Sequence, residues 1–274
     1  MTNDTRTWFI TGASRGFGRV WAHAALARGE RVAATARDVT TLDHLVADSR
    51  DAVLPLALDV TDRAACHAAV ATAHERFGRL DVVVNNAGFG HFGMVEEATE
   101  HQARAQLETN LFGALWVTQA ALPIMRAQGS GHIVQVSSLG GITAFPAIGA
   151  YHASKWALEG LSQSLAQEVA GFGIDVTLIE PGGFRTDWVG PSARRSEENP
   201  AYAEVREAQN RSWADSPGDP TATRAAILKV VDADSPPLRV FFGRAPLEVA
   251  TRDYASRLAT WNEWQSISVE AYGA

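Results

Sequence analysis

Short runs of consecutive apolar residues, rich in valine and isoleucine, recur along the first 180 residues, and one more follows near the C-terminus. Polar residues do not alternate with the apolar ones, which is typical of strands buried on both faces of a parallel sheet. The predicted strands span residues 7–12, 31–37, 52–60, 80–88, 132–138, 174–182 and 238–243.

Between these strands, apolar positions recur at helical spacing. They predict helices over residues 16–28, 62–77, 99–127 and 151–170. Because strands and helices alternate, the sequence predicts an α/β fold. We expect a single Rossmann-type, doubly wound parallel sheet of about seven strands, with helices on both faces.

Residues 183–236 interrupt this alternation. The pairs Asn199–Pro200 and Asp219–Pro220 each offer an N-cap residue before a proline at the first helical position, so two helices should begin there. We expect this segment to form a substrate loop or lid, and residues 245–274 to form a helical tail. No linker divides the chain, so residues 1–274 are expected to be one domain. The tail carries an apolar stripe through Leu247, Ala250, Tyr254, Leu258 and Trp261.

The composition narrows the possible functions. The 274 residues are 46% hydrophobic, which is enough to build a large core. The net charge of −7, without a Lys/Arg cluster, argues against a nucleic-acid partner. No apolar run approaches the ~20 residues that span a bilayer, and the N-terminus lacks a signal-peptide pattern. We therefore expect a soluble, cytoplasmic protein with no membrane partner.

Neither a disulfide nor a metal site is expected. The single cysteine, Cys66, cannot form an internal disulfide and should be a buried, inert thiol. No set of His, Cys, Asp and Glu residues has the spacing of metal ligands.

The first predicted strand leads into a glycine-rich turn, T-G-A-S-R-G-F-G at residues 11–18, which opens the first predicted helix. Glycines at such a turn let the backbone approach a pyrophosphate, and the N-terminus of a helix favours its negative charge. The spacing is not that of the G-x-G-x-x-G fingerprint, and glycine-rich turns also serve close packing. The position after the first strand nevertheless favours a dinucleotide site.

Tyr151 and Lys155 lie four residues apart on the predicted helix 151–170 and therefore share a face. A nearby ammonium favours the phenolate and lowers the pKa of a tyrosine toward the range of acid–base catalysis. Only two of the 24 basic residues, Lys155 and Lys229, are lysines, so this pair is less expected by chance. Taken alone, the pair has an alternative interpretation, in which both side chains simply lie on a solvated helix face.

Together with further motifs, these features resemble the short-chain dehydrogenase/reductase family. The family's motifs T-G-x-x-x-G-x-G, N-N-A-G, Tyr-x-x-x-Lys with a preceding serine, and Pro-Gly with a following threonine occur in the family's order between residues 7 and 190. The matching positions are residues 11–18 and 85–88, Ser138, Tyr151, Lys155, Pro181, Gly182 and Thr186.

The resemblance implies an oxidoreductase that interconverts a ketone or aldehyde and an alcohol by hydride transfer with a nicotinamide cofactor. Tyr151 would be the general acid in reduction and the general base in oxidation. Lys155 would lower the pKa of Tyr151 and hold the nicotinamide ribose. Ser138 would stabilise charge on the substrate oxygen. Asn110, in the helix after the fourth strand, would support the backbone shape and a proton relay.

The resemblance also implies a set of cofactor contacts, distributed over the ends of successive strands. The expected residues are Gly12, Ser14, Arg15, Gly16, Phe17, Gly18, Arg37, Asp59, Val60, Asn86, Ala87, Gly88, Tyr151, Lys155, Pro181, Gly182, Phe184 and Thr186.

Residues 36–38, A-R-D, bear on the choice of cofactor. NAD-preferring family members carry an acid 24 positions after the first motif glycine, where this chain has Ala36. NADP-preferring members place a base at the next position, here Arg37, and another inside the glycine turn, here Arg15. A guanidinium binds phosphate through bidentate hydrogen bonds. NADP(H) is therefore expected, with Asp38 facing away and capping the next helix.

Several side chains are candidates for a substrate pocket. His91 follows the N-N-A-G motif, where the family builds a pocket wall, and Phe145 and Trp188 lie in segments expected near the site. Tyr202 and Trp213 would add to an apolar lining. The sequence E-P-G-G-F-R-T-D-W and the tail are most similar to the branch of 17β-hydroxysteroid and retinol dehydrogenases, which implies a bulky apolar substrate.

The family often forms dimers or tetramers through the helices at 99–127 and 151–170, so a homodimer or homotetramer is expected.

Two other functions stay open. A catalytically silent NADP-binding regulator would usually lack Ser138, Tyr151 or Lys155, which are all present. A sugar-nucleotide epimerase or dehydratase tends to have a different glycine spacing and a larger C-terminal domain.

Overall fold

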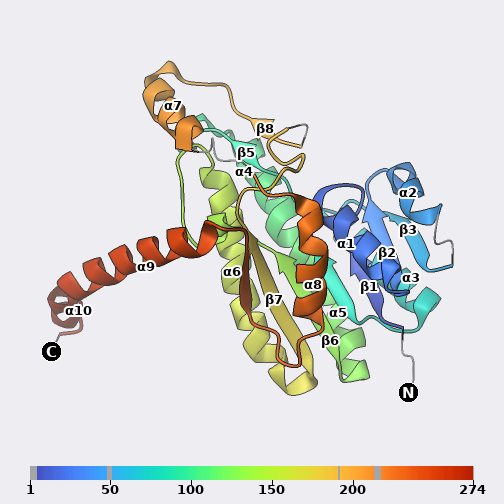
Figure 1. Cartoon of the computed structure of the whole chain (residues 1–274). Coiled ribbons are helices and arrows are strands. Elements are labelled where there is room, and N and C mark those ends of the chain that lie inside the picture. Colours follow the sequence, from blue (N-terminus) through green and yellow to red (C-terminus); the bar gives the residue numbers. More distant parts are fainter. Residues whose placement is uncertain (1–4, 48–50, 191, 213–216, 274) are drawn as a thin grey trace.

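The structure is a computed structural model that describes residues 5–47, 51–190, 192–212 and 217–273. Within these residues, seven strands form one parallel sheet in the order β3-β2-β1-β4-β6-β7-β9 (Figure 1). The order reverses between β1 and β4, which is where doubly wound sheets bind ligands. The strands are β1 (Thr7–Ile10), β2 (Arg31–Ala36), β3 (Val53–Ala57), β4 (Val82–Asn85), β6 (Gly131–Val136), β7 (Ile174–Pro181) and β9 (Arg239–Phe242).

Helices cover both faces of the sheet. One layer contains α1 (Gly16–Ala27) and α8 (Thr223–Val231), and the other contains α3 (Arg63–Phe77), α5 (Gly113–Gln128) and α6 (Gly149–Val169). Consecutive residues of β1 divide between the layers: Trp8 and Ile10 pack toward α1 and α8, whereas Phe9 packs toward α3 and α5. The predicted doubly wound α/β fold is confirmed.

The helix predicted over residues 99–127 is interrupted. It consists of α4 (Glu100–Leu107), one π-helical turn (Glu108–Phe112) and α5. A π turn adds one residue to the helical repeat and often marks a functional site. The apolar spacing does not reveal it, because the turn is centred on the buried polar side chain of Asn110.

The segment 183–236 contains the two predicted helix starts. The side chains of Asn199 and Asp219 accept hydrogen bonds from backbone amides, at 3.0 and 2.9 Å, and cap the short turns before α7 (Ala203–Ser212) and α8. However, α8 belongs to the helix layer, because Trp21 Nε1 donates to Thr223 Oγ1 at 2.9 Å. Only the part before α8 can therefore act as a lid.

The lid contributes one strand to a small two-stranded sheet. Strand β8 (Arg194–Arg195), within the lid, pairs in parallel with β5 (His91–Phe92), which follows β4. The remaining short helix, α2 (Asp43–Val46), follows β2.

The tail is helical, as predicted, and consists of α9 (Pro246–Glu263) and α10 (Gln265–Ala271), which extend away from the sheet (Figure 1). Leu258 and Trp261, from its apolar stripe, are 54% and 60% exposed. Ala250 is the buried member of the stripe, and the part of the stripe beyond it does not pack onto the core of this chain. None of the helices in the described ranges is long and apolar enough to cross a membrane. The cytoplasmic location stays a prediction.

Candidate active site

The turn at residues 11–18 needs glycine for two different reasons. Gly12 and Gly16 have φ angles of +64° and +54°, in the left-handed region that side chains disfavour. At Gly18 a Cβ would lie 2.5 Å from both Asn86 Nδ2 and the Gly12 carbonyl, so this glycine permits close packing. Because α1 begins at Gly16, its unpaired amides lie at the turn, where they can bind an anion.

The N-N-A-G motif fixes this turn to the end of β4. Thr11 Oγ1 accepts hydrogen bonds from the amides of Asn86 and Ala87, both at 2.9 Å. Asn86 Nδ2 donates to the carbonyls of Thr11 and Gly12, at 2.9 and 3.0 Å. The two motifs therefore form one rigid unit.

A cleft of about 2800 Å³ lies at the carboxyl ends of the strands. Each expected cofactor residue lines it except Gly18, which is buried in the turn. The same cleft continues past Ser138, Tyr151 and Lys155 to Phe145 and Trp188. The structure thus brings the glycine turn and the expected catalytic side chains into one continuous site.

Arg15 and Arg37 are exposed at the edge of this cleft. In the part of the chain that the structure describes, neither guanidinium has an ion pair or hydrogen bond with another side chain. Asp38 accepts from the amide and the hydroxyl of Thr40, at 3.0 and 2.7 Å, and caps the turn that follows. These hydrogen bonds hold the pKa of Asp38 below its usual value. Its carboxylate is therefore engaged in the cap that the sequence predicts.

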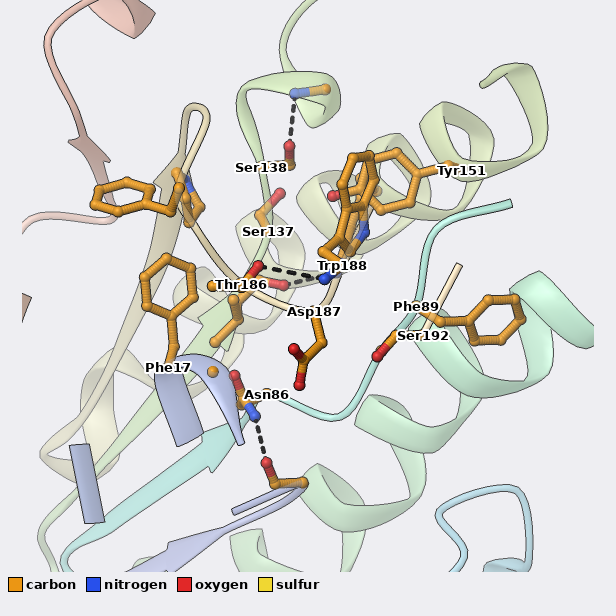
Figure 2. Close-up of a pocket in the computed structure, with 18 of the residues that line it drawn as sticks. Phe17, Asn86, Phe89, Ser137, Ser138, Tyr151, Thr186, Asp187, Trp188 and Ser192 are labelled. Atoms are coloured by element: carbon orange, nitrogen blue, oxygen red, sulfur yellow. Dashed lines mark hydrogen bonds between the residues drawn. The ribbon is translucent and has the colours of Figure 1, made fainter. Parts of the chain in front are cut away.

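Tyr151 and Lys155 lie one turn apart on α6, and Ser138 faces Tyr151 from the end of β6 (Figure 2). Burial raises the pKa of Tyr151 to about 12, and its hydrogen bond with Ser138 acts in the opposite direction. Burial lowers the pKa of Lys155 to about 8, while the charge of Glu159 acts to raise it.

The contact between Tyr151 and Lys155 differs from the expected one. Lys155 Nζ donates to the carbonyl of Val136 at 2.7 Å and lies 5.8 Å from the centroid of the Tyr151 ring. The ammonium therefore faces the ring and the end of β6. The loss of solvent around the phenol raises the Tyr151 pKa in this structure, and the expected lowering by Lys155 stays a prediction for the complex with cofactor.

Asn110 is buried and lies behind the cleft lining. Its Oδ1 accepts from the amide of Phe89, and its Nδ2 donates to the Phe89 carbonyl and to Ser154 Oγ, all at 3.1 Å. Asn110 therefore holds the backbone that follows the N-N-A-G motif. The expected role in a proton relay stays a prediction.

Aromatic side chains cover the catalytic tyrosine. The Trp188 ring centroid lies 5.0 Å from those of Tyr151 and Phe92. Gly90 makes room for it, since a Cβ there would lie 2.6 Å from the indole. Phe145 lines the same end of the cleft. Together these rings give the expected substrate end an apolar wall.

Two of the expected pocket residues, His91 and Tyr202, are placed elsewhere. His91 is buried in β5, with Nε2 3.0 Å from Ser196 Oγ, and does not line the cleft, because the pairing of β5 with β8 covers it. Tyr202 also lies outside the cleft lining and donates to Glu96. Trp213 is outside the described residues.

The cleft also contains residues that the sequence did not indicate. Phe89, Asp187 and Ser192 line it (Figure 2). Phe89 and Asp187 are direct neighbours of motif residues, which is a usable signal. Ser192 lies in the lid, whose position depends on tertiary packing that no local pattern encodes.

The comparisons with known proteins agree with this fold. The model of the family described as short chain dehydrogenase matches residues 6–197. This places the protein among oxidoreductases that act on carbonyl and alcohol groups with NAD(H) or NADP(H). The chain belongs to the short-chain dehydrogenase/reductase family.

Two curated relatives illustrate the family. Oxidoreductase BOA17 of Botryotinia fuckeliana is 44% identical over 270 residues, covering 97% of this chain and 98% of the relative. The 3-ketodihydrosphingosine reductase of Bacteroides thetaiotaomicron is 36% identical over 243 residues, covering 85% and 86%. Neither name specifies a steroid or retinol dehydrogenase, so the expected branch is not specifically supported.

Two solved structures are similar over nearly the whole chain. A short-chain dehydrogenase from Streptomyces avermitilis superimposes with a TM-score of 0.92 at 44% identity, covering 97% of this chain and 99% of that one. A short-chain dehydrogenase/reductase from Burkholderia phymatum, in complex with NAD, has a TM-score of 0.79 at 25% identity, covering 94% and 96%.

Proposed function

We propose that this protein is an NADP(H)-dependent oxidoreductase that interconverts a ketone or aldehyde and an alcohol on a bulky apolar substrate. The observation that carries the proposal is the continuous cleft. It joins the glycine turn, the exposed Arg37, the Ser138–Tyr151 pair and the apolar wall around Trp188. A cofactor held at one end and a carbonyl held at the other would meet beside Tyr151.

The residues of the cleft fit a dinucleotide. A Cβ at Gly12 would lie 3.1 Å from Ala87 Cα, so only a glycine keeps the turn both tight and open toward a pyrophosphate. The cofactor, when bound, supplies or accepts the hydride. Lys155 would hold its ribose hydroxyls, and the residues from Pro181 to Thr186 would border its nicotinamide end.

Tyr151 is suited to giving a proton to a carbonyl oxygen. Because burial raises its pKa to about 12, it keeps the proton at neutral pH. Ser138 can donate a hydrogen bond to the same oxygen as negative charge develops there. Trp188 shields this position from water, which strengthens both interactions. These features fit Tyr151 and Ser138 to the proton-donating role in reduction.

Arg37 and Arg15 support a preference for NADP(H). Among the described residues, their guanidinium groups have no side-chain partner, and they lie at the cleft edge, where a 2′-phosphate needs a cation. Ala36 ends β2 without an acid that would repel that phosphate. The Burkholderia phymatum structure contains NAD, so family membership alone does not decide the cofactor.

The substrate class rests on the apolar wall and on analogy. Phe145 and Trp188 favour an apolar skeleton next to the carbonyl. The name of the Bacteroides thetaiotaomicron relative describes the reduction of a keto compound, which is consistent with this direction. In its more specific form, the proposal assigns this chain to the branch of 17β-hydroxysteroid and retinol dehydrogenases.

A spectrophotometric screen separates this proposal from its alternatives. NADPH and NADH would each be offered with aromatic, steroidal and aliphatic ketones, and cofactor oxidation followed. Oxidation that depends on an added ketone supports the proposal. Cofactor binding without turnover would favour the silent regulator. Conversion of a sugar nucleotide without net cofactor oxidation would favour the epimerase or dehydratase.

We also propose that the protein forms a homodimer or homotetramer. The tail exposes apolar side chains that lack a place in the core of this chain, including Leu258, Trp261, Trp264 and Ile267. Contiguous apolar surface of this kind marks association sites, and closed symmetric oligomers are the commonest solution.

A further inference from the structure

Two buried carboxylates lie behind the catalytic cleft. Glu159 follows Lys155 by one turn of α6, and Glu180 lies near the end of β7; they are 5% and 1% exposed. Arg239, from β9, contacts both. Its Nε donates to Glu159 Oε2 at 2.9 Å and lies 3.5 Å from Glu180 Oε1. One arginine thus faces two acids.

The remaining oxygens of this cluster are poorly satisfied. Glu159 Oε1 and Ser137 Oγ are buried without a well-aligned hydrogen bond in the described ranges, and Glu180 Oε1 has only the 3.5 Å contact with Arg239 Nε. Ser137 and Glu180 nevertheless lie close enough to Glu159 to lower its pKa, against the effect of burial. Two carboxylates in contact cannot both ionise at low cost, whereas a proton on one lets it donate to the other. Burial and the charge of Glu159 raise the pKa of Glu180 to about 8. The shorter contact of Arg239 favours the charge on Glu159.

The pair supports the segment that carries the catalytic serine. Ser137 precedes Ser138, and its amide donates to the carbonyl of Ile179, the neighbour of Glu180, at 2.8 Å. A Cβ at Gly141 would lie 2.7 Å from Ser137 Oγ and 3.0 Å from Glu159 Cγ. The segment 137–141 therefore rests directly on the Glu159 side chain.

We propose that Glu159 and Glu180 are a positioning pair for the catalytic residues. One shared proton leaves a single negative charge on Glu159 beside Lys155, and the pair fixes the segment that presents Ser138. The roles of Lys155 and Ser138 are those of the proposed function, on which this inference rests. The charged groups facing Glu159 are Lys155 on its own helix, Glu180 on β7 and Arg239 on β9.

Since the chain has only two lysines, Lys155 can be observed directly. Protein labelled with ¹³C at the lysine Cε would give one signal for Lys155 and one for Lys229, which serves as the internal reference. In the wild type, Lys155 should titrate near pH 8. Glu159→Gln should lower this midpoint by about one pH unit, because an opposite charge is removed. Glu180→Gln should leave it in place, because Glu159 keeps its charge.

Glu168→Gln is the matched control, since Glu168 is an exposed carboxylate on the same helix. It should leave the Lys155 midpoint unchanged. In the active enzyme, Glu159→Gln should move the basic limb of the kcat–pH profile to lower pH by the same amount as the Lys155 midpoint. A purely structural role for Glu159 would lower activity without moving that limb.

A titration of ¹³C-labelled glutamate carboxyls tests the shared proton. One signal should titrate near pH 8 in the wild type and in Glu168→Gln, and be absent from Glu180→Gln. A wild type with no glutamate titrating above neutral pH would overturn the proposal, even if the glutamine variants fail to fold. So would an unmoved Lys155 midpoint in folded Glu159→Gln. Neither titration needs a substrate. If both titrations give the expected results in a protein that shows no reductase activity, the proposed function is rejected and the positioning pair is retained.

Discussion

Lys155 holds its ammonium over the ring of Tyr151, 5.8 Å from the ring centroid, while donating to the carbonyl of Val136 at 2.7 Å. The two side chains therefore have separate tasks in the proposed reaction. Tyr151 keeps its proton, because burial raises its pKa to about 12. Lys155 is anchored to the end of β6, where burial lowers its pKa and the charge of Glu159 acts to raise it.

Replacing Arg37 should change the cofactor preference. We expect Arg37→Asp to reduce the ratio of kcat/KM for NADPH over NADH roughly 10- to 100-fold, since a charged hydrogen bond contributes about 1.5–3 kcal/mol. The ratio is measured with one ketone at saturating concentration. Asp38→Asn is the control and should leave the ratio unchanged, because Asp38 serves the cap. Equal efficiency of the wild type with both cofactors would contradict this account.

Removing the Trp188 ring should weaken substrate binding without affecting the cofactor. The indole packs against Tyr151 at the apolar end of the cleft, 5.0 Å between ring centroids. We expect Trp188→Ala to raise the KM of an apolar ketone about tenfold or more, given ~1.5–3 kcal/mol for a buried apolar side chain. The Kd of NADPH, measured by fluorescence, should be unchanged. An equal loss in NADPH affinity would show that Trp188 serves the cofactor instead.

His132 should make the protein less stable in acid. It is buried in β6, with Nε2 2.9 Å from Thr177 Oγ1, and burial, together with the charge of Arg6, lowers its pKa from 6.5 to about 4. Between these values the unfolded chain binds more protons, so the free energy of unfolding falls as the pH decreases through this window. The loss should reach about 3 kcal/mol at the acid end. Urea denaturation at several pH values should show a flatter decline for His132→Gln, and an identical decline in both proteins would remove His132 as the cause.

The exposed tail should hold the oligomer together. Trp261 and Trp264 are each 60% exposed on α9 and at the junction with α10. Replacing both by serine should shift the molecular mass seen by light scattering toward the monomer, because apolar contact area is lost. Val95→Ser, which changes an exposed apolar residue far from the tail in the sequence, is the control. A wild-type monomer at micromolar concentration would contradict the proposal.

The sequence predicts the sheet well because its strands are continuous apolar runs, and such runs have few alternatives to burial in a parallel sheet. The observed strands end earlier than predicted. β4, for example, stops at Asn85, because the next residues bind the glycine turn through Thr11. The π turn at Asn110 and the layer position of α8 are not encoded by apolar spacing. Both depend on contacts between distant segments.

The site was predictable where a motif fixes a local backbone shape. The glycine turn and the Tyr151–Lys155 spacing both lead to the cleft, and Asp38 caps the next turn as expected. His91 was placed in the substrate pocket from its position after a motif, whereas the pairing of β5 with β8 encloses it. The Glu159–Glu180 pair joins residues from two elements, so no local pattern could indicate it.

The most direct measurement compares ketone-dependent NADPH oxidation by the wild type and Tyr151→Phe, alongside the NADPH Kd of each. We expect the variant to lose at least about 100-fold in kcat, because the proton donor is missing, and to keep its affinity for NADPH. Tyr202→Phe, which changes a tyrosine outside the cleft lining, should retain full activity. Near-normal turnover in Tyr151→Phe would contradict the central claim.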